Sequence, residues 1–368
     1  MPAEHSEHRG LYIHIPFCKK KCGYCDFASY DNRQNDIGIY LDALEKEAQL
    51  HKRLAGSFDT VYIGGGTPSI LSPSQLKRLL AIIKNMYEPQ MLREFTVEAN
   101  PESMTAEKAE ILAEAGADRI SMGLQSSKPE LLKKIGRITS PEEFAKAWEI
   151  LRKAGFRNIN ADLMTGLPGQ TLKDFEDSVD FLIRLHPEHI SLYPLEIHEG
   201  TMLAALGMQE NPDGAADMYD YACARLPKDG YERYEISNFS IPGKESRHNI
   251  HYWLQEEYLG LGPAAASYIA GERRASAPEL DSWAEALNKG IMPAYSSEKL
   301  EGRQKDAEKI ILGLRLTEGI EISANIFIEF KDKFRSEIAQ NFLDIRGSRI
   351  KLKPEKTYLA NRLFLEFM

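Results

Sequence analysis

Short runs rich in β-branched and aromatic residues alternate, through the first half of the chain, with longer amphipathic stretches. The short runs predict strands at Leu11–Ile15, Thr60–Ile63, Glu94–Glu98, Arg119–Gly123, Asn158–Leu163 and His189–Tyr193. The amphipathic stretches predict helices at Asp36–Arg53, Ser74–Tyr87, Ala106–Ala115, Glu142–Ala154 and Leu172–Leu185. This regular alternation of strands and helices is typical of α/β proteins.

The alternation predicts a parallel sheet, because parallel neighbours must be joined by crossover segments. A spacing of about thirty residues between strands fits a partial (β/α)6 barrel of the TIM type. In such barrels the active face lies at the carboxyl ends of the strands. Residues that directly follow each predicted strand are therefore the first candidates for function.

The chain changes character after Trp253. Tyr258–Ser267 is rich in small residues, which suits close backbone packing. From about Glu298 the pattern predicts helices at Gly302–Arg315 and Ser323–Ile338, a hairpin around Arg346–Ser348 with Ile350–Leu352, and a last helix at Tyr358–Phe367. We therefore expect residues 1–253 to form the barrel, 254–297 to be a connecting segment, and 298–368 to form a small, winged-helix-like α+β module.

Composition and charge narrow the class of protein. Hydrophobic residues make up 43% of the 368 residues, and no apolar run has the length of a membrane span. The first ten residues are polar, so no export signal is predicted, and a reducing, cytoplasmic location follows. A formal net charge of −9 argues against non-specific binding to nucleic acid.

Three of the four cysteines, Cys18, Cys22 and Cys25, lie within eight residues directly after the first predicted strand. Three thiolates on one short loop suit a [4Fe–4S] cluster, because each can bind a different iron and leave the fourth iron open. A zinc site would need a fourth ligand, for which His14 is the nearest candidate. Its alternation with apolar residues favours a buried, satisfied histidine instead. We interpret Lys19–Lys21 as a solvated loop rather than a docking site for an electron donor.

Glycines and polar residues follow the other predicted strands in the same position. The second strand is followed by Gly64-Gly65-Gly66-Thr67-Pro68, in which the glycines let a ligand approach the backbone. The later strands end at Glu98-Ala99-Asn100-Pro101, at Gly123-Leu124-Gln125-Ser126 and in the run from Asp162 to Gly169. Taken singly, each polar residue is a common cap or turn former. Their repeated position predicts one polar mouth at the carboxyl ends of the strands.

The combination of these motifs resembles the radical S-adenosylmethionine superfamily, in the branch of the oxygen-independent coproporphyrinogen III oxidases and their relatives. The likeness rests on the Cys-x3-Cys-x2-Cys loop, the Gly-Gly-Gly-Thr-Pro segment, Glu98, Gln125, Gly136-Arg137 and Asp162, and it runs from Leu11 to about Trp253. It implies that Cys18, Cys22 and Cys25 hold a [4Fe–4S] cluster whose open iron binds S-adenosylmethionine. An electron from the cluster would then cleave S-adenosylmethionine to methionine and a 5′-deoxyadenosyl radical.

The resemblance also assigns residues to S-adenosylmethionine. The matching positions are Tyr12, Tyr24, Gly65, Gly66, Thr67, Glu98, Gln125, Arg137 and Asp162. Within this set, Glu98 suits the amino group of the ligand, and Arg137 suits a carboxylate. After Gly136-Arg137 the family often has x-His, where this chain has Ile138-Thr139, so the contribution of that histidine is missing.

Two features separate this chain from the oxidases. The oxidases carry a further cysteine two positions after the third cluster ligand, where this chain has Phe27. In addition, Arg247–Trp253 contains His-Asn-x-x-Tyr-Trp, which resembles the signature of the haem-chaperone branch. A short segment before the first strand, without the longer amino-terminal extension of the oxidases, favours the same branch.

The signature implies a haem site. His248 would be the ligand of the haem iron, and His251 is the second candidate. Tyr252 and Trp253 would supply flat apolar surface and hydrogen-bond donors to the haem. Cys223 stands apart from the other cysteines and is expected to be an inert thiol.

Two hypotheses about function follow from the resemblance. The first is a haem chaperone that binds a [4Fe–4S] cluster, S-adenosylmethionine and haem, and passes haem to acceptor proteins, some of them membrane-bound. The second is an oxygen-independent coproporphyrinogen III oxidase, which converts two propionates into vinyl groups by radical chemistry. Phe27 and the His248–Trp253 motif favour the chaperone, and a radical enzyme with another substrate is a third alternative. An electron donor such as flavodoxin or ferredoxin is a further expected partner, and the oligomeric state stays open.

Overall fold

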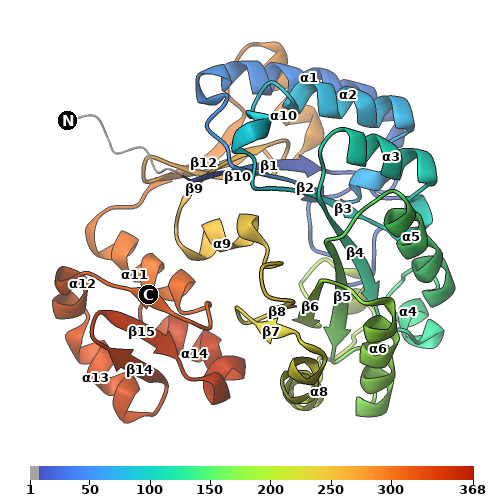
Figure 1. Ribbon diagram of the computed structural model, residues 1–368. Coiled ribbons are helices and arrows are strands. Elements are labelled where there is room, and N and C mark those ends of the chain that lie inside the picture. The colour runs from blue at the N-terminus through green and yellow to red at the C-terminus, as the bar shows by residue number, and fades with distance from the viewer. Residues whose placement is uncertain (1–7) are drawn as a thin grey trace.

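The six predicted strands lie side by side in one curved sheet (Figure 1). The computed structural model describes residues 8–368. The prediction that the first residues carry no export signal concerns residues 1–7 in large part, and these lie outside the described residues. The strands are β1 (Arg9–Ile15), β2 (Thr60–Gly65), β3 (Glu94–Ala99), β4 (Arg119–Gln125), β5 (Ile159–Thr165) and β6 (His189–Pro194). Each pairs in parallel with the next along the chain. The predicted α/β partial barrel is therefore confirmed.

Helices between the strands cover the outer side of the sheet (Figure 1). They are α1 (Ile37–Leu50), α2 (Pro73–Ile83), α3 (Ala106–Glu114), α4 (Pro129–Lys134), α5 (Pro141–Lys153) and α6 (Leu172–Leu185). Three of them begin at capping boxes, in which Ser72, Ser140 and Thr171 exchange hydrogen bonds with the residue three positions on. Their apolar faces and the strands form one continuous core. Among the described residues, no helix is long and apolar enough to cross a membrane.

The sheet continues beyond the six strands at both edges. Within residues 8–368 it has 12 strands in the order β12-β11-β10-β9-β1-β2-β3-β4-β5-β6-β8-β7. The added strands are β7 (Glu232–Arg233), β8 (Asn238–Ser240), β9 (Glu257–Leu261), β10 (Ala266–Ile269), β11 (Glu272–Ser276) and β12 (Ala294–Lys299). β9 is parallel to β1, and the other added strands pair antiparallel. Residues 254–297, expected as a connection, thus extend the sheet and place α10 (Leu280–Asn288) against α1.

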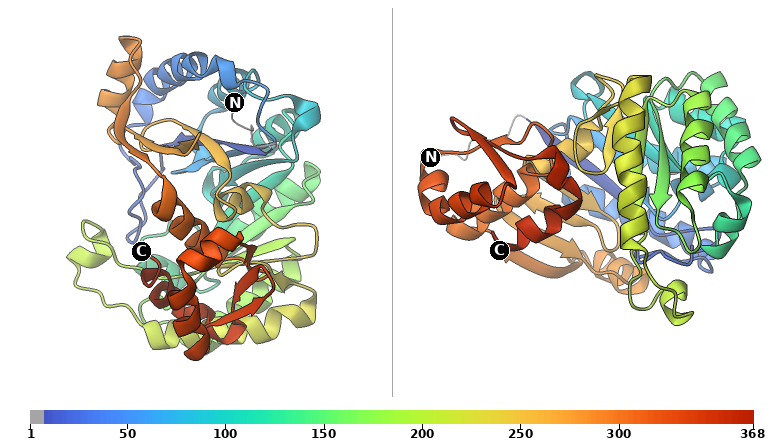
Figure 2. Two further views of the ribbon diagram at one scale, coloured as in Figure 1. Left: turned by 90° about the vertical axis from the view of Figure 1, so that its left-hand side faces the viewer. Right: turned by 90° about the horizontal axis from the view of Figure 1, so that it is seen from below.

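The carboxyl-terminal residues form a module beside the barrel (Figure 2). The module has an apolar core of its own. Its elements are α11 (Gly302–Gly313), β13 (Ile320–Glu321), α12 (Ala324–Glu329), α13 (Lys331–Ala339), β14 (Leu343–Arg346), β15 (Arg349–Leu352) and α14 (Ala360–Leu365). The second predicted helix is divided at Phe330, which leaves the helical conformation between α12 and α13. The antiparallel sheet has the order β13-β15-β14. α11 packs against α9, which joins the module to the barrel.

α9 (Arg247–Trp253) lies inside the curve of the sheet, against β1, β2 and β9 (Figure 1). The buried Glu94 carboxylate, at the start of β3, accepts hydrogen bonds from the backbone N–H groups of Arg247 and His248 at 2.8 and 3.2 Å. Ser246 caps the same end of the helix with its side chain. Because Glu94 lies at the amino end of its strand, α9 fills the barrel at the end opposite the predicted mouth.

The last turn of α9 is held by buried ion pairs. His251 Nε2 lies 3.0 Å from Asp59 Oδ1, directly before β2, and His251 Nδ1 contacts the Glu256 carboxylate. Burial by itself would lower the pKa of His251, but the two carboxylates raise it to about 9. His251 is therefore protonated in the folded protein at neutral pH.

Replacing His251 by Gln is expected to remove a pH-dependent part of the stability. Because the folded-state pKa of His251 lies above its usual value of about 6.5, its contribution is complete below that pH and is lost as the pH rises through about 9. In urea denaturation, the free energies of unfolding of wild type and variant should differ by about 1–3 kcal/mol at about pH 6 and by much less at about pH 9.5. A difference that does not change with pH would contradict this assignment.

Candidate functional site

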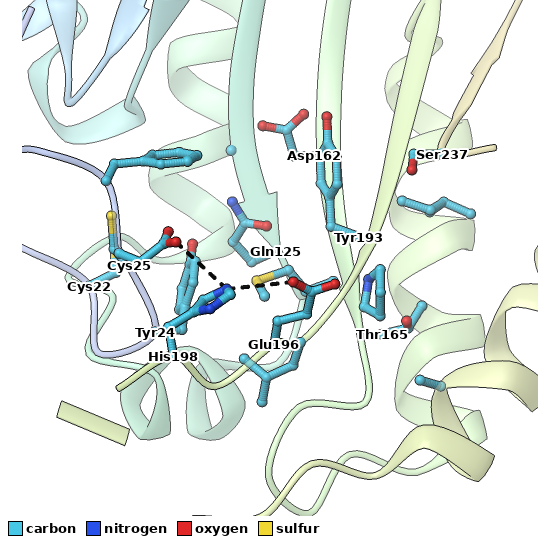
Figure 3. Close-up of a pocket in the computed structure, with 18 of the residues that line it drawn as sticks. Cys22, Tyr24, Cys25, Gln125, Asp162, Thr165, Tyr193, Glu196, His198 and Ser237 are labelled. Carbon is cyan, nitrogen blue, oxygen red and sulfur yellow. Dashed lines mark ion pairs between the residues drawn. The ribbon is translucent and has the colours of Figure 1, made fainter. Parts of the chain in front are cut away.

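The carboxyl ends of the parallel strands surround a cavity of about 880 Å³ (Figure 3). Most of the predicted site residues line this cavity: Cys18, Cys22, Tyr24, Cys25, Gly65, Gly66, Thr67, Glu98, Gln125, Arg137 and Asp162. One cavity thus brings together predicted groups from five strand ends, those of β1 to β5, and the loops that follow them. Its volume lies within the range of about 300–1,000 Å³ that is usual for ligand and cofactor sites.

The cysteine loop between β1 and α1 is held from two sides. On one side, the Thr67 N–H donates to the Phe17 carbonyl at 2.8 Å. On the other side, the Gly23 N–H donates to the Ile135 carbonyl, after α4, at 2.8 Å. These hydrogen bonds hold the backbone of the loop at two points.

The three cysteines of the loop face the cavity, Cys18 buried and the other two half-buried. Burial raises the pKa of Cys18 and Cys25, and the neighbouring Cys22 adds to both shifts. The thiols are thus close enough to interact, and a bound metal would deprotonate them. Thr67 Oγ1 donates to Cys18 Sγ at 3.7 Å and Arg137 Nη1 to Cys22 Sγ at 3.8 Å. Such donors stabilise negative charge on sulfur.

His14, the additional candidate ligand for zinc, is engaged elsewhere. Its Nδ1 lies 3.0 Å from the Tyr12 hydroxyl, and its Nε2 lies 2.8 Å from the Ala28 carbonyl. The side chain is buried, so the prediction of a satisfied interior histidine is confirmed. Within residues 8–368, no three His, Cys, Asp or Glu side chains converge as the ligands of a single metal ion would. An iron–sulfur cube does not need such convergence, because each thiolate binds its own iron.

The glycine triplet lets two chain segments come closer than side chains would permit. Gly65 has a φ of +108°, and a Cβ there would meet the His14 ring at 2.6 Å. A Cβ at Gly66 would lie 2.7 Å from the Phe17 carbonyl oxygen. Each of these two positions therefore accepts only glycine. The amide of Gly65 is then free to donate to Glu98 Oε2 at 3.0 Å.

Two half-buried carboxylates, Glu98 and Asp162, line the cavity. Glu98 Oε1 accepts a hydrogen bond from the Tyr62 hydroxyl at 2.7 Å, and burial raises the pKa of Glu98 to about 7. Asp162 Oδ1 accepts from Asn160 Nδ2 at 2.6 Å, and burial raises its pKa too. A cationic ligand group would stabilise the charged form of both carboxylates.

Gln125 and Arg137 add the complementary groups. Gln125 has a φ of +69° at an irregularity in the pairing of β4 with β5, and its Oε1 is buried without a hydrogen-bond partner. Backbone strain and an unsatisfied amide at a cavity are typical of ligand sites. Burial by itself would lower the pKa of Arg137, but Tyr24 and Cys22 leave it raised, so its charge is permanent. The cavity can therefore bind an ammonium group and a carboxylate together.

Four predicted residues are not among those lining the cavity: Tyr12, His248, Tyr252 and Trp253. His248 is 1% exposed, with Nδ1 2.8 Å from Thr60 Oγ1 and Nε2 2.8 Å from the Tyr252 hydroxyl. Its ring stacks on Tyr62 at 5.1 Å between centroids, and burial lowers its pKa to about 3. In this conformation both ring nitrogens are engaged, because Glu94 binds the amino end of α9 and directs His248 into the barrel.

The other three residues occupy the surroundings of α9. Tyr12 lies in the barrel interior, with its hydroxyl on His14 and its ring 6.1 Å from that of Tyr62. The Tyr252 ring meets the Tyr258 ring edge-on at 4.6 Å. Trp253 lies under Arg315, whose guanidinium carbon is 4.3 Å from the indole centroid.

Several residues that line the cavity were not predicted, among them Tyr193, Glu196, His198, Ser237, Arg315 and Tyr358. His198 Nε2 lies 3.5 Å from Glu196 and 3.6 Å from Asp26 (Figure 3). Tyr193 lies near the carboxyl end of β6, just as other site residues lie at the carboxyl ends of their strands. The position of a residue at a strand end could therefore have indicated Tyr193 as well. Arg315 and Tyr358 come from the carboxyl-terminal module, and no local pattern indicates that this module meets the cavity.

The remaining predicted positions lie at or beyond the rim. Phe27 lines the cavity and is 62% exposed. Lys19 and Lys20 are exposed, and Lys21 Nζ donates to the Phe27 carbonyl at 2.8 Å. Cys223 lies on α8 (Pro212–Arg225), partly buried beside Arg233.

Comparison with known proteins shows what the chain is similar to. Residues 12–182 match the radical SAM superfamily. The chain is 39% identical to the heme chaperone HemW of Bacillus subtilis, over 85% of this chain and 84% of the relative. It is 37% identical to the heme chaperone HemW of Lactococcus lactis, over 97% of this chain and 96% of the relative. It is also 33% identical to the mitochondrial radical S-adenosyl methionine domain-containing protein 1 of Bos taurus, over 87% of this chain and 76% of the relative.

A solved structure shows the same fold. The coproporphyrinogen III oxidase HemN of Escherichia coli superposes with a TM-score of 0.86, over 98% of this chain and 90% of that chain. The two sequences are 22% identical, so the superposition is evidence for a common fold rather than a common activity.

Replacing Gly66 by Ala is expected to displace the cysteine loop, because the new Cβ would lie 2.7 Å from the Phe17 carbonyl oxygen and 2.9 Å from that of Ile15. These backbone atoms cannot rotate away, so the free energy of unfolding in urea should fall by about 1–3 kcal/mol. Gly38→Ala in α1 is the matched control, because a Cβ there meets nothing within 4 Å. It should be neutral or stabilising. Equal stabilities of the two variants would disprove the close contact.

Proposed function

Because the chain belongs to the radical S-adenosylmethionine superfamily and, within it, to the family of the HemW proteins, we propose that it is a haem chaperone. It binds a [4Fe–4S] cluster, S-adenosylmethionine and haem, and passes haem to acceptor proteins. The observation that carries this proposal is the identity of 39% and 37% to relatives named heme chaperones, over most of both chains.

Cys18, Cys22 and Cys25 hold the cluster in this proposal. The support is a loop whose three thiols share one cavity, with hydrogen-bond donors on two of the sulfurs. Donors of this kind tune the potential of a cluster. When bound, the cluster and S-adenosylmethionine supply the electron and the sulfonium for radical chemistry. The chain itself contributes binding, orientation and exclusion of water.

S-adenosylmethionine carries an ammonium group beside a carboxylate, and the cavity offers partners for both. Glu98 and Asp162 favour the ammonium group, while Arg137 favours the carboxylate. Gln125 supplies a further hydrogen bond through its unsatisfied amide. Gly65 also lines the cavity, and its amide holds the Glu98 carboxylate in place. Tyr24, Gly66 and Thr67 complete this part of the wall, and Tyr12 supports it from the barrel interior through His14.

An oxygen-independent coproporphyrinogen III oxidase is the alternative. The fold shared with HemN does not favour it, since the fold alone does not carry the activity. Phe27 occupies the position where the oxidases have a further cysteine, at the rim of the cavity. The phenyl ring of Phe27 has no S–H group that could act as a nucleophile or give up a hydrogen atom. The chain therefore lacks oxidase activity in this proposal.

His248 is the ligand of the haem iron in this proposal, and its low pKa keeps the imidazole neutral, as iron ligation requires. Because Nε2 is bonded to the Tyr252 hydroxyl, ligation requires that Tyr252 moves away. His251 is the weaker candidate, since Asp59 and Glu256 keep it protonated. α9 is only 7 residues long, so the movement that frees His248 can be local.

The partners follow from the same chemistry. An electron donor such as flavodoxin or ferredoxin must come close to the cluster loop to reduce the cluster. Haem acceptors, including membrane-bound ones, make transient contact to receive the haem. Three reduced thiols as cluster ligands require a reducing compartment, so we place the protein in the cytoplasm.

Haem uptake and cluster assembly are expected to be separable. After anaerobic reconstitution, the variant with Cys18, Cys22 and Cys25 all replaced by Ser should lack iron–sulfur absorption and still bind haem in a spectrophotometric titration. Neither it nor the wild type should form protoporphyrinogen from coproporphyrinogen. Protoporphyrinogen formation at a rate that follows 5′-deoxyadenosine release, or a wild type that takes up no haem, would refute the proposed function.

Tyr252→Phe is expected to speed haem uptake, and His248→Gln to prevent iron ligation. Loss of one hydrogen bond, about 1 kcal/mol, should increase the accessible fraction of His248 and the stopped-flow association rate about fivefold. Thr60→Val, which frees only Nδ1, is the matched control and should leave the rate within about twofold of wild type. An unchanged haem absorption spectrum in His248→Gln would exclude His248 as the ligand.

A further inference from the structure

Part of the cavity wall comes from the carboxyl-terminal module. Arg315, just after α11, lines the cavity together with Tyr358 and Asn361. Its guanidinium carbon lies 4.3 Å from the ring centroid of Trp253, the last residue of α9. Arg315 thus links the cavity to the helix that carries His248.

The guanidinium of Arg315 lacks adequate partners within the described residues. Its Nε is buried without a hydrogen bond, and its Nη2 lies 3.9 Å from Glu235 Oε2. A charge-assisted hydrogen bond would be about 2.7–2.9 Å long. The buried Glu235 carboxylate therefore attracts Arg315 but does not satisfy the guanidinium donors. The other oxygen of Glu235, Oε1, accepts a hydrogen bond from the Ser237 N–H at 2.8 Å. The indole Nε1 of Trp253 is also buried without a partner.

Two acidic side chains of the cavity, Glu196 and Glu210, have other partners than Arg315. Glu196 Oε2 lies 3.5 Å from His198, and Glu210 Oε1 accepts from the Ile197 N–H at 2.7 Å. Near Arg315, the cavity is lined by flat or apolar side chains that include Tyr219, Ile236 and Tyr358. This part of the site combines apolar surface with an unsatisfied cation, which matches a ligand that is flat, apolar and carboxylated at its edge.

We propose that Arg315 binds a carboxylate of the ligand that enters this part of the cavity. On the proposed function, on which this inference rests, that carboxylate is a haem propionate. The planar guanidinium offers donors in a fork that matches a carboxylate. Trp253 acts as a positioning residue, because stacking fixes the plane of the guanidinium. The tryptophan of the signature motif then needs no contact with the haem itself.

This arrangement places the bound haem near its iron ligand. Trp253 lies five residues after His248, which corresponds to about 7.5 Å along α9. A propionate held at Arg315 therefore keeps the haem beside the helix whose movement frees His248. Carboxylate binding and iron ligation become successive contacts on the same helix.

The test compares two ligands in titrations of the full chain, haem and haem dimethyl ester, which lacks free carboxylates. Arg315→Gln should weaken haem binding about 10- to 100-fold and leave binding of the diester unchanged. Arg315→Lys keeps the charge but not the fork and should restore part of the affinity. Trp253→Leu should also weaken binding of haem and not of the diester, but by a smaller factor than Arg315→Gln. Arg303→Gln is the matched control, since Arg303 lies 4.3 Å over the Phe330 ring, pairs with Glu329 and is not among the residues lining the cavity.

The outcomes separate this inference from the proposed function. Wild-type haem affinity in Arg315→Gln, or an equal loss for haem and its diester, would overturn the assignment of Arg315 while the chaperone proposal stands. An effect of Arg303→Gln as large as that of Arg315→Gln would overturn it as well. Failure of the wild type to bind haem would contradict the proposed function and, with it, the propionate site.

Discussion

The backbone contact between the glycine triplet and the cysteine loop is the constraint on which the site depends. Parallel pairing of β1 with β2 continues past the strands, where the Gly66 N–H donates to the Ile15 carbonyl and the Thr67 N–H to the Phe17 carbonyl, each at 2.8 Å. At Gly65 and Gly66 this approach leaves no room for a Cβ. It sets Cys18 against Thr67 and aims the Gly65 amide at Glu98. One segment therefore positions both the cluster loop and a carboxylate of the cofactor site.

The two ends of the barrel have different roles and are joined by few side chains. At the carboxyl end lies the cavity, and at the amino end lies α9 with His248. Tyr62 spans the distance, with its hydroxyl on Glu98 and its ring stacked on His248. Arg315 over Trp253 makes a second connection, along the outside of α9. His248 is thus buried close to both connections with the cavity.

Local sequence patterns predicted the parts of the fold that depend on local physics. The six parallel strands, their helices and the strand-end residues Glu98, Gln125 and Asp162 followed from periodicity and position, because each is set by its own strand. β11 did not, since the charged pair Arg273-Arg274 gives no strand pattern and the strand depends on its neighbours. Sequence likeness indicated His248, but its burial depends on Glu94, 154 residues earlier. Arg315 reaches the cavity only through the packing of the module.

The central claim, that this chain carries haem rather than converting a porphyrin precursor, is tested most directly by haem transfer. Protein loaded with one equivalent of haem is mixed with an apo-haemoprotein, and the absorption spectrum of the acceptor is followed with time. The account predicts transfer of up to one haem per chain, without porphyrin products and without consumption of S-adenosylmethionine in proportion to the haem moved. Haem that never leaves the chain, or repeated turnover of coproporphyrinogen by the same preparation, would contradict it.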